Sequence, residues 1–344
     1  MSAIMVKTDN SFGDKRVFIT GADGFIGSHL AEALVRCGAK VTALALYNSF
    51  GTAGWLDEIS DDVRTDMHIE LGDVRDGVQM RGLAEGSDVI FHLAALIGIP
   101  YSYVAAQSYV DVNVHGTLNL LEAARAGTMG RLIHTSTSEV YGSALERPIS
   151  ELHALHGQSP YAASKIGADQ MVEAFARSHD LPAVMLRPFN TFGPRQSERA
   201  IIPTAIRQML DPDCSEVHLG DLSTTRDFNF VGDTVRAFMA LGSAEDAEFG
   251  TAYNAGTGLE IEISAVVTML NELTGNNKAI ISEKSRLRPA QSEVRALVAD
   301  ARRLTALSGW RPETDLESGL SQCVDWWRER IASGRLRRDA SFAR

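Results

Sequence analysis

Hydrophobic and polar positions follow two alternating periods along the first half of the chain. Short apolar runs bounded by glycine or polar residues are typical of buried strands, and apolar residues at every third or fourth position are typical of amphipathic helices. The predicted strands are Arg16–Thr20, Val41–Leu46, Met67–Leu71, Asp88–Leu93, Arg131–Ser136 and Ala183–Arg187. The predicted helices between them include Ile26–Cys37, Val110–Ala126 and Ser164–Ser178.

This alternation predicts an α/β protein with a Rossmann-like, doubly wound parallel sheet. After Pro188 the pattern loosens into proline-rich loops and isolated helices, which indicates a smaller C-terminal α/β substrate domain. The predicted later helices are Gly232–Leu241, Ile263–Leu273 and Leu316–Ile331. We expect a Rossmann domain over residues 1–188, to which 229–260 return, and a substrate domain made of 189–228 and 261–344.

Charge and cysteine content narrow the classes of partner. The net charge of −11 repels nucleic acid and anionic membranes, so we expect neither as a partner. An anionic small substrate then requires arginines in its pocket. Cys37, Cys214 and Cys323 are far apart, which predicts neither a disulfide framework nor a metal site and favours a cytoplasmic location. Met1–Arg16 lacks a signal-peptide core, and Val89–Pro100 is too short to span a bilayer.

A glycine-rich loop separates the first predicted strand from the first predicted helix. Glycine permits a tight turn, close approach of the backbone to a pyrophosphate, and close packing of helix on sheet. The helix N-terminus offers free N–H groups to phosphate. In this strand–turn–helix context the loop predicts a dinucleotide cofactor. The predicted contacts are Gly21, Asp23, Gly24, Phe25, Ile26 and Gly27.

The remaining cofactor contacts are expected after the next strands. The second strand is followed by Asn48, with no acid for a ribose 2′-hydroxyl and no arginine for a 2′-phosphate, so the residues leave NAD and NADP open, with NAD slightly favoured. Asp73 and Val74 follow the third strand, where Asp73 either contacts the adenine or is a solvated turn residue. The small residues Leu93, Ala94 and Ala95 follow the fourth strand, beside the middle of the cofactor.

Candidate catalytic residues gather after the fifth strand. Tyr161 and Lys165 are four apart at the start of a helix and share one face, where a lysine cation is expected to lower the pKa of the phenol. By itself the pair is also compatible with a plain surface contact. The strand end supplies Thr137 and Ser138, and it supplies Glu139 as an acid or base, or alternatively as a cap of the next turn.

Together these motifs resemble the extended short-chain dehydrogenase/reductases, in their nucleotide-sugar epimerase/dehydratase branch. The resemblance runs from about Arg16 to the C-terminal helix and includes segments 187–194, 219–221, 225–228 and 288–289. It implies a nucleotide-sugar substrate whose phosphates are held by arginine forks. It also implies a homodimer through the helices at 110–126 and 164–178, unless these only cover the sheet. The implied substrate contacts are Asn190, Arg195, Leu219, Gly220, Arg226 and Arg288.

The reaction is narrowed by the sequence Ser136-Thr137-Ser138-Glu139. The same four residues occur in GDP-mannose 4,6-dehydratases and in UDP-glucuronate decarboxylases. Segments 47–57, 98–103 and 288–294 are similar to the 4,6-dehydratases of legionaminic-acid biosynthesis. The resemblance therefore favours a dehydratase acting on GDP- or UDP-N-acetylglucosamine, with a 4-epimerase and a UDP-glucuronate decarboxylase as alternatives.

A redox-sensing binding protein is a reading from another class, but such proteins typically lose the Tyr/Lys pair that this chain retains. For the Ser164 hydroxyl and for His134 we expect structural roles.

Overall fold

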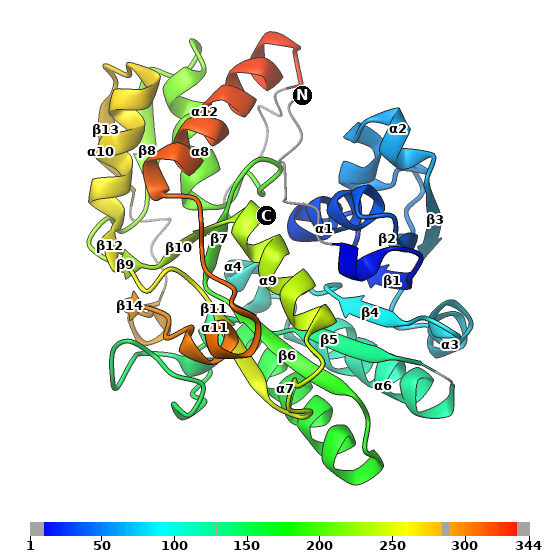
Figure 1. Cartoon of the computed structure of the whole chain (residues 1–344). Helices are drawn as coiled ribbons and strands as arrows, with labels where there is room; N and C mark the ends of the chain where they lie inside the picture. The colour runs from blue at the N-terminus through cyan, green and yellow to red at the C-terminus, as the bar shows by residue number, and fades with distance from the viewer. Residues whose placement is uncertain (1–9, 128, 284–288, 336–344) are drawn as a thin grey trace.

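The apolar runs assemble into one parallel sheet (Figure 1). The computed structural model describes residues 10–127, 129–283 and 289–335. The sheet has seven strands in the order β11-β6-β5-β4-β1-β2-β3, and every neighbouring pair is parallel. The strands are β1 (Arg16–Thr20), β2 (Lys40–Leu46), β3 (Met67–Gly72), β4 (Val89–His92), β5 (Arg131–Thr135), β6 (Ala183–Pro188) and β11 (Ala252–Ala255).

Helices cover both faces of this sheet, which explains why the central strands are almost continuously apolar. On one face, α1 (Phe25–Arg36) and α9 (Val231–Ser243) enclose a core with β1, β2 and β4. On the other face lie α3 (Gly77–Ala84), α6 (Gly116–Ala126) and α7 (Pro160–His179). The strand order reverses between β1 and β4, and such a switch point opens a ligand crevice at the carboxyl ends of the strands. The predicted Rossmann-like architecture is therefore confirmed.

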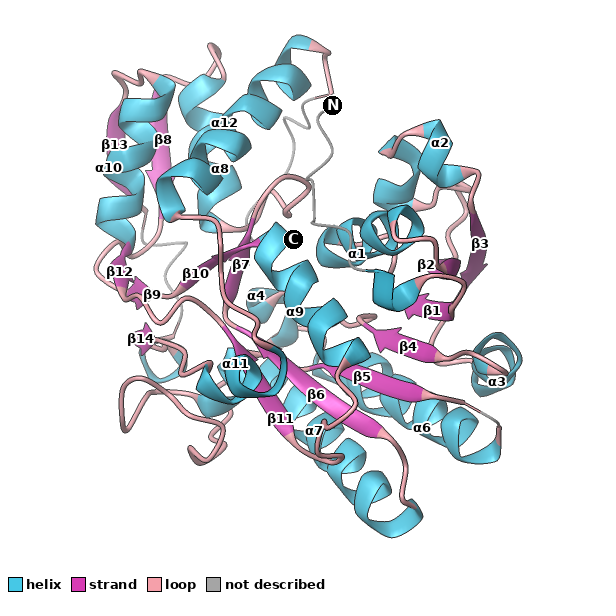
Figure 2. Cartoon of the chain, viewed as in Figure 1, coloured by secondary structure: helices cyan, strands magenta, loops and turns pink. Residues whose placement is uncertain are grey.

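The C-terminal lobe is built from segments that are distant in sequence (Figure 2). Three small sheets and three helices enclose a second core there. The sheets pair β7 (Asn190–Phe192) with β10 (Phe228–Phe230), β8 (Glu216–Leu219) with β13 (Ala279–Ser282), and β9 (Thr225–Arg226) with both β12 (Ile261–Glu262) and β14 (Ala296–Leu297). The helices are α8 (Ile201–Leu210), α10 (Ile263–Thr274) and α12 (Leu316–Ala332).

Short helical turns fill the connections between these elements. The predicted helix over 110–126 begins as a π-helical segment before it continues as α6, and two further turns precede it. The turns are η1 (Asn10–Phe12), η2 (Gly54–Glu58), α2 (Asp61–Arg64), α4 (Ile99–Ser102), α5 (Ala106–Tyr109), η3 (Val110–His115), η4 (Ser138–Tyr141), η6 (Ala290–Ser292) and α11 (Arg302–Ser308).

Helix α7 begins four residues before the predicted start at Ser164. The hydroxyl of Ser159 accepts a hydrogen bond from the Ala162 N–H at 3.1 Å, and Pro160 occupies the first helical position. Both features are favourable at a helix N-terminus. As a result Tyr161 and Lys165 both lie within the first two turns of α7.

The end of the chain returns to the Rossmann sheet. Leu304 and Trp310 are buried in the core shared by α1 and α9, although the predicted division placed them in the substrate domain. Hydrophobic packing explains this difference, because both side chains find their apolar partners on the sheet.

A clasp, formed by Trp55 and Glu58 of η2 with Trp326 and Arg330 of α12, also joins the two regions. Arg330 donates to Glu58 at 2.8 Å and lies over both indole rings, whose centroids are 5.7 Å apart. Such cation–π and ionic contacts are stronger when partly buried. The clasp therefore ties the C-terminal helix to the loop that follows β2.

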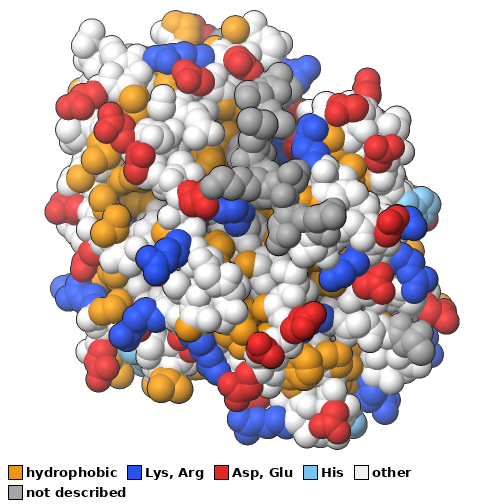
Figure 3. All heavy atoms as spheres, viewed as in Figure 1, with side chains coloured by type: hydrophobic (Ala, Val, Ile, Leu, Met, Phe, Trp, Pro, Cys, Tyr) orange, Lys and Arg blue, Asp and Glu red, His pale blue; other side chains and the backbone are white. Residues whose placement is uncertain are grey.

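Acidic and basic side chains are interspersed over the face of the molecule shown in Figure 3. Within residues 10–127, 129–283 and 289–335, no helix is long and apolar enough to cross a membrane.

Candidate active site

The glycine-rich loop places backbone where a side chain does not fit. Gly21 has φ +68°, and a Cβ there would lie 2.7 Å from the Ala94 nitrogen of the loop after β4. A Cβ at Gly27 would lie 2.1 Å from the Gly21 oxygen. Helix α1 starts at Gly24 with no side-chain cap, so its N-terminal N–H groups face the crevice unscreened by a cap. These features suit the pyrophosphate of a dinucleotide.

Asp23 connects this loop to the end of β2. Its carboxylate accepts from the Leu46 N–H at 3.3 Å, and burial raises its pKa although that hydrogen bond opposes the rise. A Cβ at Gly54 would approach the Asp23 oxygen to 2.6 Å, so the segment after β2 packs directly on the loop. Asp23 therefore fixes the shape of the crevice wall.

The amide of Asn48 is engaged by its own loop. Its nitrogen donates to the carbonyls of Leu46 at 3.1 Å and Thr52 at 2.7 Å, and its oxygen accepts from the Phe50 and Thr52 N–H groups. Such local bonding is typical of asparagine in turns. The geometry does not support the predicted ribose contact, because both ends of the amide already have partners.

Asp73 and the residues after β4 lie at the adjacent strand ends. Asp73 forms a 2.6 Å ion pair with Arg75, and this hydrogen bonding holds its pKa below the usual value. That pairing agrees better with the turn-residue alternative than with a free adenine contact. Val74 is buried beneath α6, with a Cβ at Gly116 only 2.8 Å from it. Residues 93–95 are half-buried beside Gly21.

Tyr161, Thr137 and Glu139 form the centre of the site. Tyr161 is buried, and burial raises its pKa, while a hydrogen bond with Thr137 opposes the rise and the nearby Glu139 charge adds to it. Thr137 also accepts from the Glu139 N–H at 3.2 Å. In the chain alone burial dominates and the pKa of Tyr161 is raised, so the lowering expected from Lys165 stays a prediction.

Lys165 is buried behind Tyr161 in α7. Burial lowers its pKa to about 8, with the Asp169 charge acting in the opposite direction. Its Nζ lies 3.4 Å from Nε2 of His134. The Ser164 hydroxyl donates to the Tyr161 carbonyl at 2.7 Å, which agrees with its expected structural role, and Ser138 is buried in η4.

Two residues of this cluster were not singled out as site residues from the sequence. Asp169 lies one helical turn beyond Lys165, a spacing of four that was available as a signal. Asn113 donates to the Ser164 hydroxyl at 2.9 Å and bonds Leu96 in both directions. No local pattern indicated Asn113, because its partners lie on other elements.

The predicted substrate residues divide into two groups. Asn190 on β7 has a buried side-chain oxygen with no hydrogen-bond partner in the described chain, which suits a donor on a bound ligand. Arg226 on β9 is almost fully buried and pairs with Glu293 at 3.1 Å. The Leu219 side chain packs in the C-terminal core, so only the backbone of Leu219 and Gly220 is left for the predicted substrate contact.

Arg195 is not beside Arg226. Its guanidinium forms a 2.9 Å ion pair with Glu32 and contacts Ser28 at 3.3 Å, both on α1. Arg195 therefore joins the segment after β7 to the Rossmann helix, and its contact with the substrate stays a prediction. Arg288 lies outside the described residues.

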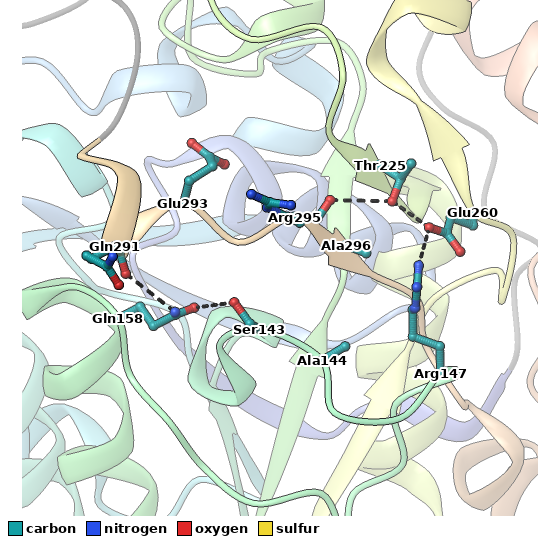
Figure 4. A pocket seen from close by; sticks show the side chains of 10 residues that line it. All are labelled: Ser143, Ala144, Arg147, Gln158, Thr225, Glu260, Gln291, Glu293, Arg295 and Ala296. Atoms are coloured by element: carbon teal, nitrogen blue, oxygen red, sulfur yellow. Dashed lines mark hydrogen bonds and ion pairs between the residues drawn. The ribbon is translucent and has the colours of Figure 1, made fainter.

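A cavity of about 550 Å³ adjoins this region (Figure 4). It is bordered by Gln158, which comes just before α7. Thr225, which precedes Arg226 in the chain, and Glu293, which forms an ion pair with Arg226, also border it. Arg147 and Glu260, which form an ion pair at 2.7 Å, lie in its wall. The described residues contain no group of three or more His, Cys, Asp or Glu side chains able to hold a metal ion.

A Rossmann-like sheet with a glycine-rich loop and a Tyr/Lys pair on one helix defines an extended short-chain dehydrogenase/reductase. Within this class, the model of the family described as GDP-mannose 4,6 dehydratase matches residues 18–323, and the chain belongs to that family.

Known relatives include more than one activity. The chain is 33% identical over 321 residues to the dTDP-glucose 4,6-dehydratase of Actinoplanes sp., covering 91% of this chain and 98% of that protein. It is 32% identical over 320 residues to the UDP-glucose 4-epimerase of Mycolicibacterium smegmatis, with 92% and 99% covered. The crystal structure of DesIV, a dTDP-glucose 4,6-dehydratase from Streptomyces venezuelae with NAD and TYD bound, is similar with a TM-score of 0.80 and 27% identity over 92% of this chain and 98% of that one.

Proposed function

We propose that this protein is an NAD-dependent nucleotide-sugar 4,6-dehydratase acting on GDP- or UDP-N-acetylglucosamine. The observation that carries the proposal is the position of Glu139, whose N–H donates to Thr137 at 3.2 Å and whose charge acts on the nearby Tyr161. A 4-epimerase requires no second acid–base group, whereas elimination of water requires one to remove the C5 proton.

The residues present fit NAD. The loop at 21–27 receives the pyrophosphate at the N-terminus of α1, and residues 93–95 border the middle of the cofactor. Bound there, NAD would supply reversible hydride transfer between the sugar and the nicotinamide ring. The support for NAD over NADP is that DesIV, a related dehydratase, was solved with NAD.

The chain's own side chains move the protons. Tyr161 accepts the proton of the C4 hydroxyl. Thr137 positions the phenol by a hydrogen bond, and the Lys165 cation stabilises the phenolate. The resulting 4-ketone acidifies the C5 hydrogen, which Glu139 removes. The same proton then passes to the C6 hydroxyl, which leaves as water. C5 takes up a proton from water when C6 receives the hydride, and Tyr161 releases to water the proton that it took from the C4 hydroxyl, which restores the starting state. Ser138, buried beside Glu139, lies on the path of that proton.

The C-terminal lobe binds the nucleotide diphosphate in this proposal. Arg226 presents the buried guanidinium, which binds phosphate oxygens bidentately. The unpaired oxygen of Asn190 accepts from the sugar or ribose. The choice of N-acetylglucosamine is supported by the similarity of segments 47–57 and 98–103 to the legionaminic-acid dehydratases.

We also propose a cytoplasmic homodimer through η3, α6 and α7. Met171 and Phe175 on α7 remain half-exposed, and Val110 of η3 is exposed, which suits a helical interface. Light scattering after gel filtration tests this assembly, and a monomer at micromolar concentration would contradict it.

Product analysis tests the activity. The purified protein is incubated with GDP-N-acetylglucosamine, UDP-N-acetylglucosamine and UDP-glucuronate, and the products are identified by mass spectrometry. Loss of one water supports a dehydratase and identifies its nucleotide. An isomer of unchanged mass would support a 4-epimerase instead, and loss of carbon dioxide from the glucuronate would support a decarboxylase.

Two variants connect the activity to the site. Tyr161→Phe should reduce turnover about 1,000-fold, the usual range for loss of an acid–base group. Glu139→Gln should abolish loss of water, but oxidation of the sugar at C4 should still reduce the bound NAD. The reduced nicotinamide is detected by its absorbance. A Glu139→Gln variant that still released water at the native rate would exclude Glu139 as the C5 base.

A further inference from the structure

A buried row of charged and polar groups runs from Lys165 away from the crevice. Nζ of Lys165 lies 3.4 Å from Nε2 of His134, which lies 3.5 Å from Oδ1 of Asp169. The other oxygen of Asp169 accepts from Ser136 at 2.7 Å and from Arg187 at 2.9 Å. All five side chains are buried, so water does not screen these interactions.

His134 lies between the ammonium group of Lys165 and the carboxylate of Asp169. Burial, followed by the Lys165 charge, lowers the pKa of His134 to about 4, so the ring is neutral at physiological pH. One nitrogen, Nε2, faces both Lys165 and Asp169, while Nδ1 has no hydrogen-bond partner in the described chain. In a neutral ring Nε2 either carries the proton and donates toward Asp169 or lacks it and accepts from a protonated Lys165, and the second tautomer is the one that stabilises the ammonium group.

Asp169 provides the compensating charge. An ammonium group buried in the protein interior is costly unless an anion lies near it. Asp169 acts on Lys165 in that sense, and it is itself fixed by Ser136 and Arg187. Its position therefore depends on β5 and β6 as well as on α7, so the sheet sets the place of the lysine.

We propose that Asp169 and His134 are positioning residues for Lys165, which hold its ammonium group against the sheet and keep it protonated during turnover. The proposal rests on the proposed function, in which a charged Lys165 supports Tyr161 while the phenol exchanges a proton. Neither residue touches the substrate, so each acts only through Lys165.

Other titratable groups face this cluster. His92 on β4 stacks near His134 with ring centroids 5.4 Å apart, and burial, then His134 and Lys165, keep its pKa well below the usual value. Arg187 on β6 contributes a second cation next to Asp169. Toward the crevice, Tyr161 faces Glu139 of η4 and Tyr109 of α5.

Nuclear magnetic resonance of labelled lysine side chains tests the proposal without any substrate. The chain has only Lys7, Lys15, Lys40, Lys165, Lys278 and Lys284, so few signals appear, and Lys165→Met assigns the one of interest. In the full chain we expect this signal to titrate near pH 8, where burial places the pKa of Lys165. In Asp169→Asn the midpoint should fall by about one pH unit or more, the usual effect of losing a close opposite charge.

Matched variants separate positioning from general damage. His134→Gln keeps an acceptor near Nε2 and should leave the midpoint close to the native one, whereas His134→Leu should lower it. Asp233→Asn removes another fully buried carboxylate, one that pairs with Arg236 in α9, and should not move the Lys165 midpoint. If Asp169→Asn does not fold, the double variant Asp169→Asn/Arg187→Gln removes both buried charges together.

Turnover then provides the second readout. The alkaline limb of the pH profile of kcat should move down with the Lys165 midpoint in Asp169→Asn and His134→Leu, and stay in place in His134→Gln. An unchanged Lys165 midpoint in both Asp169→Asn and His134→Leu would overturn the proposal whatever the activity. A protein that shows no dehydratase turnover but the expected midpoint shifts would instead contradict the proposed function and leave the positioning network supported.

Discussion

The seven-stranded sheet and the C-terminal lobe are assembled on different principles. In the sheet, the first six strands are joined in chain order by helical connections, and every strand except the edge strands β3 and β11 is paired on both sides. In the lobe, two- to four-residue strands pair across long intervals, as β9 at 225–226 does with β14 at 296–297. The comparison teaches that the cofactor crevice is determined by local geometry, whereas the substrate side is determined by long-range packing.

The largest expected effect concerns the core of the lobe. Trp327 on α12 is buried among residues of α8 and α10, and Trp327→Ala should destabilise the protein by about 4 kcal/mol. If the lobe core is separate from the sheet, hydrogen exchange should accelerate in α8 and α10 but not in β1, β4 or β5. Equal acceleration of hydrogen exchange in the lobe and in the sheet would show that the two cores are not separate.

The corresponding test in the sheet region is Gly27→Ala. The added methyl would lie 2.1 Å from the Gly21 oxygen, so we expect a loss of about 3 kcal/mol in unfolding free energy and loss of NAD binding, measured by denaturation and calorimetry. Gly82→Ala is the control, because a Cβ there meets nothing within 4 Å in helix α3. Alanine should raise stability there by up to about 1 kcal/mol.

A smaller effect should appear as a pH dependence within the sheet region, at the buried Lys165 of α7. Lys165 has a pKa of about 8 in the folded protein, below its unfolded value. The unfolded chain therefore binds more protons in this window, and the stability contributed by Lys165 is present above about pH 10 and is lost as pH falls through 8. Relative to Lys165→Met, the unfolding free energy should rise by about 2 kcal/mol from pH 8 to pH 10. A flat difference between the two proteins would show that the lysine is not desolvated.

The smallest effect is expected at the clasp between the regions. Arg330→Gln removes the ion pair with Glu58 and the contacts over Trp55 and Trp326, and should reduce stability by about 1 kcal/mol. Arg328→Gln, on the same helix but half-exposed, should change it far less. Equal effects of the two substitutions, measured by urea denaturation, would argue against a specific clasp.

The predictability of the structure follows the same division. Six of the seven strands of the sheet and the loop at 21–27 were predicted to within about two residues, because periodicity and glycine placement are local signals. The seventh strand, β11, was not predicted. The early start of α7 was missed although Ser159 and Pro160 are a recognisable start signal. The three small sheets were not predicted, since two-residue strands such as β9 and β14 carry no periodic pattern.

The candidate site was predictable in its residue types but not in its partners. Tyr161, Thr137 and Glu139 lie together because adjacent elements deliver them to the same strand ends. Arg195 and Asn48 were assigned to ligands, whereas the fold gives them Glu32 and the carbonyl of Thr52 as partners. Sequence spacing does not reveal a partner more than 160 positions away, as in the pair of Arg195 with Glu32.

The clasp affects the order in which segments of the chain reach their folded positions. Glu58 is synthesised before its partner Arg330, which follows 272 positions later. Because contacts of such separation form slowly and late, the segment after β2 is not held in place until α12 has been made. The loop that follows β2 therefore reaches its final position only after the lobe on the other side of the clasp has been synthesised.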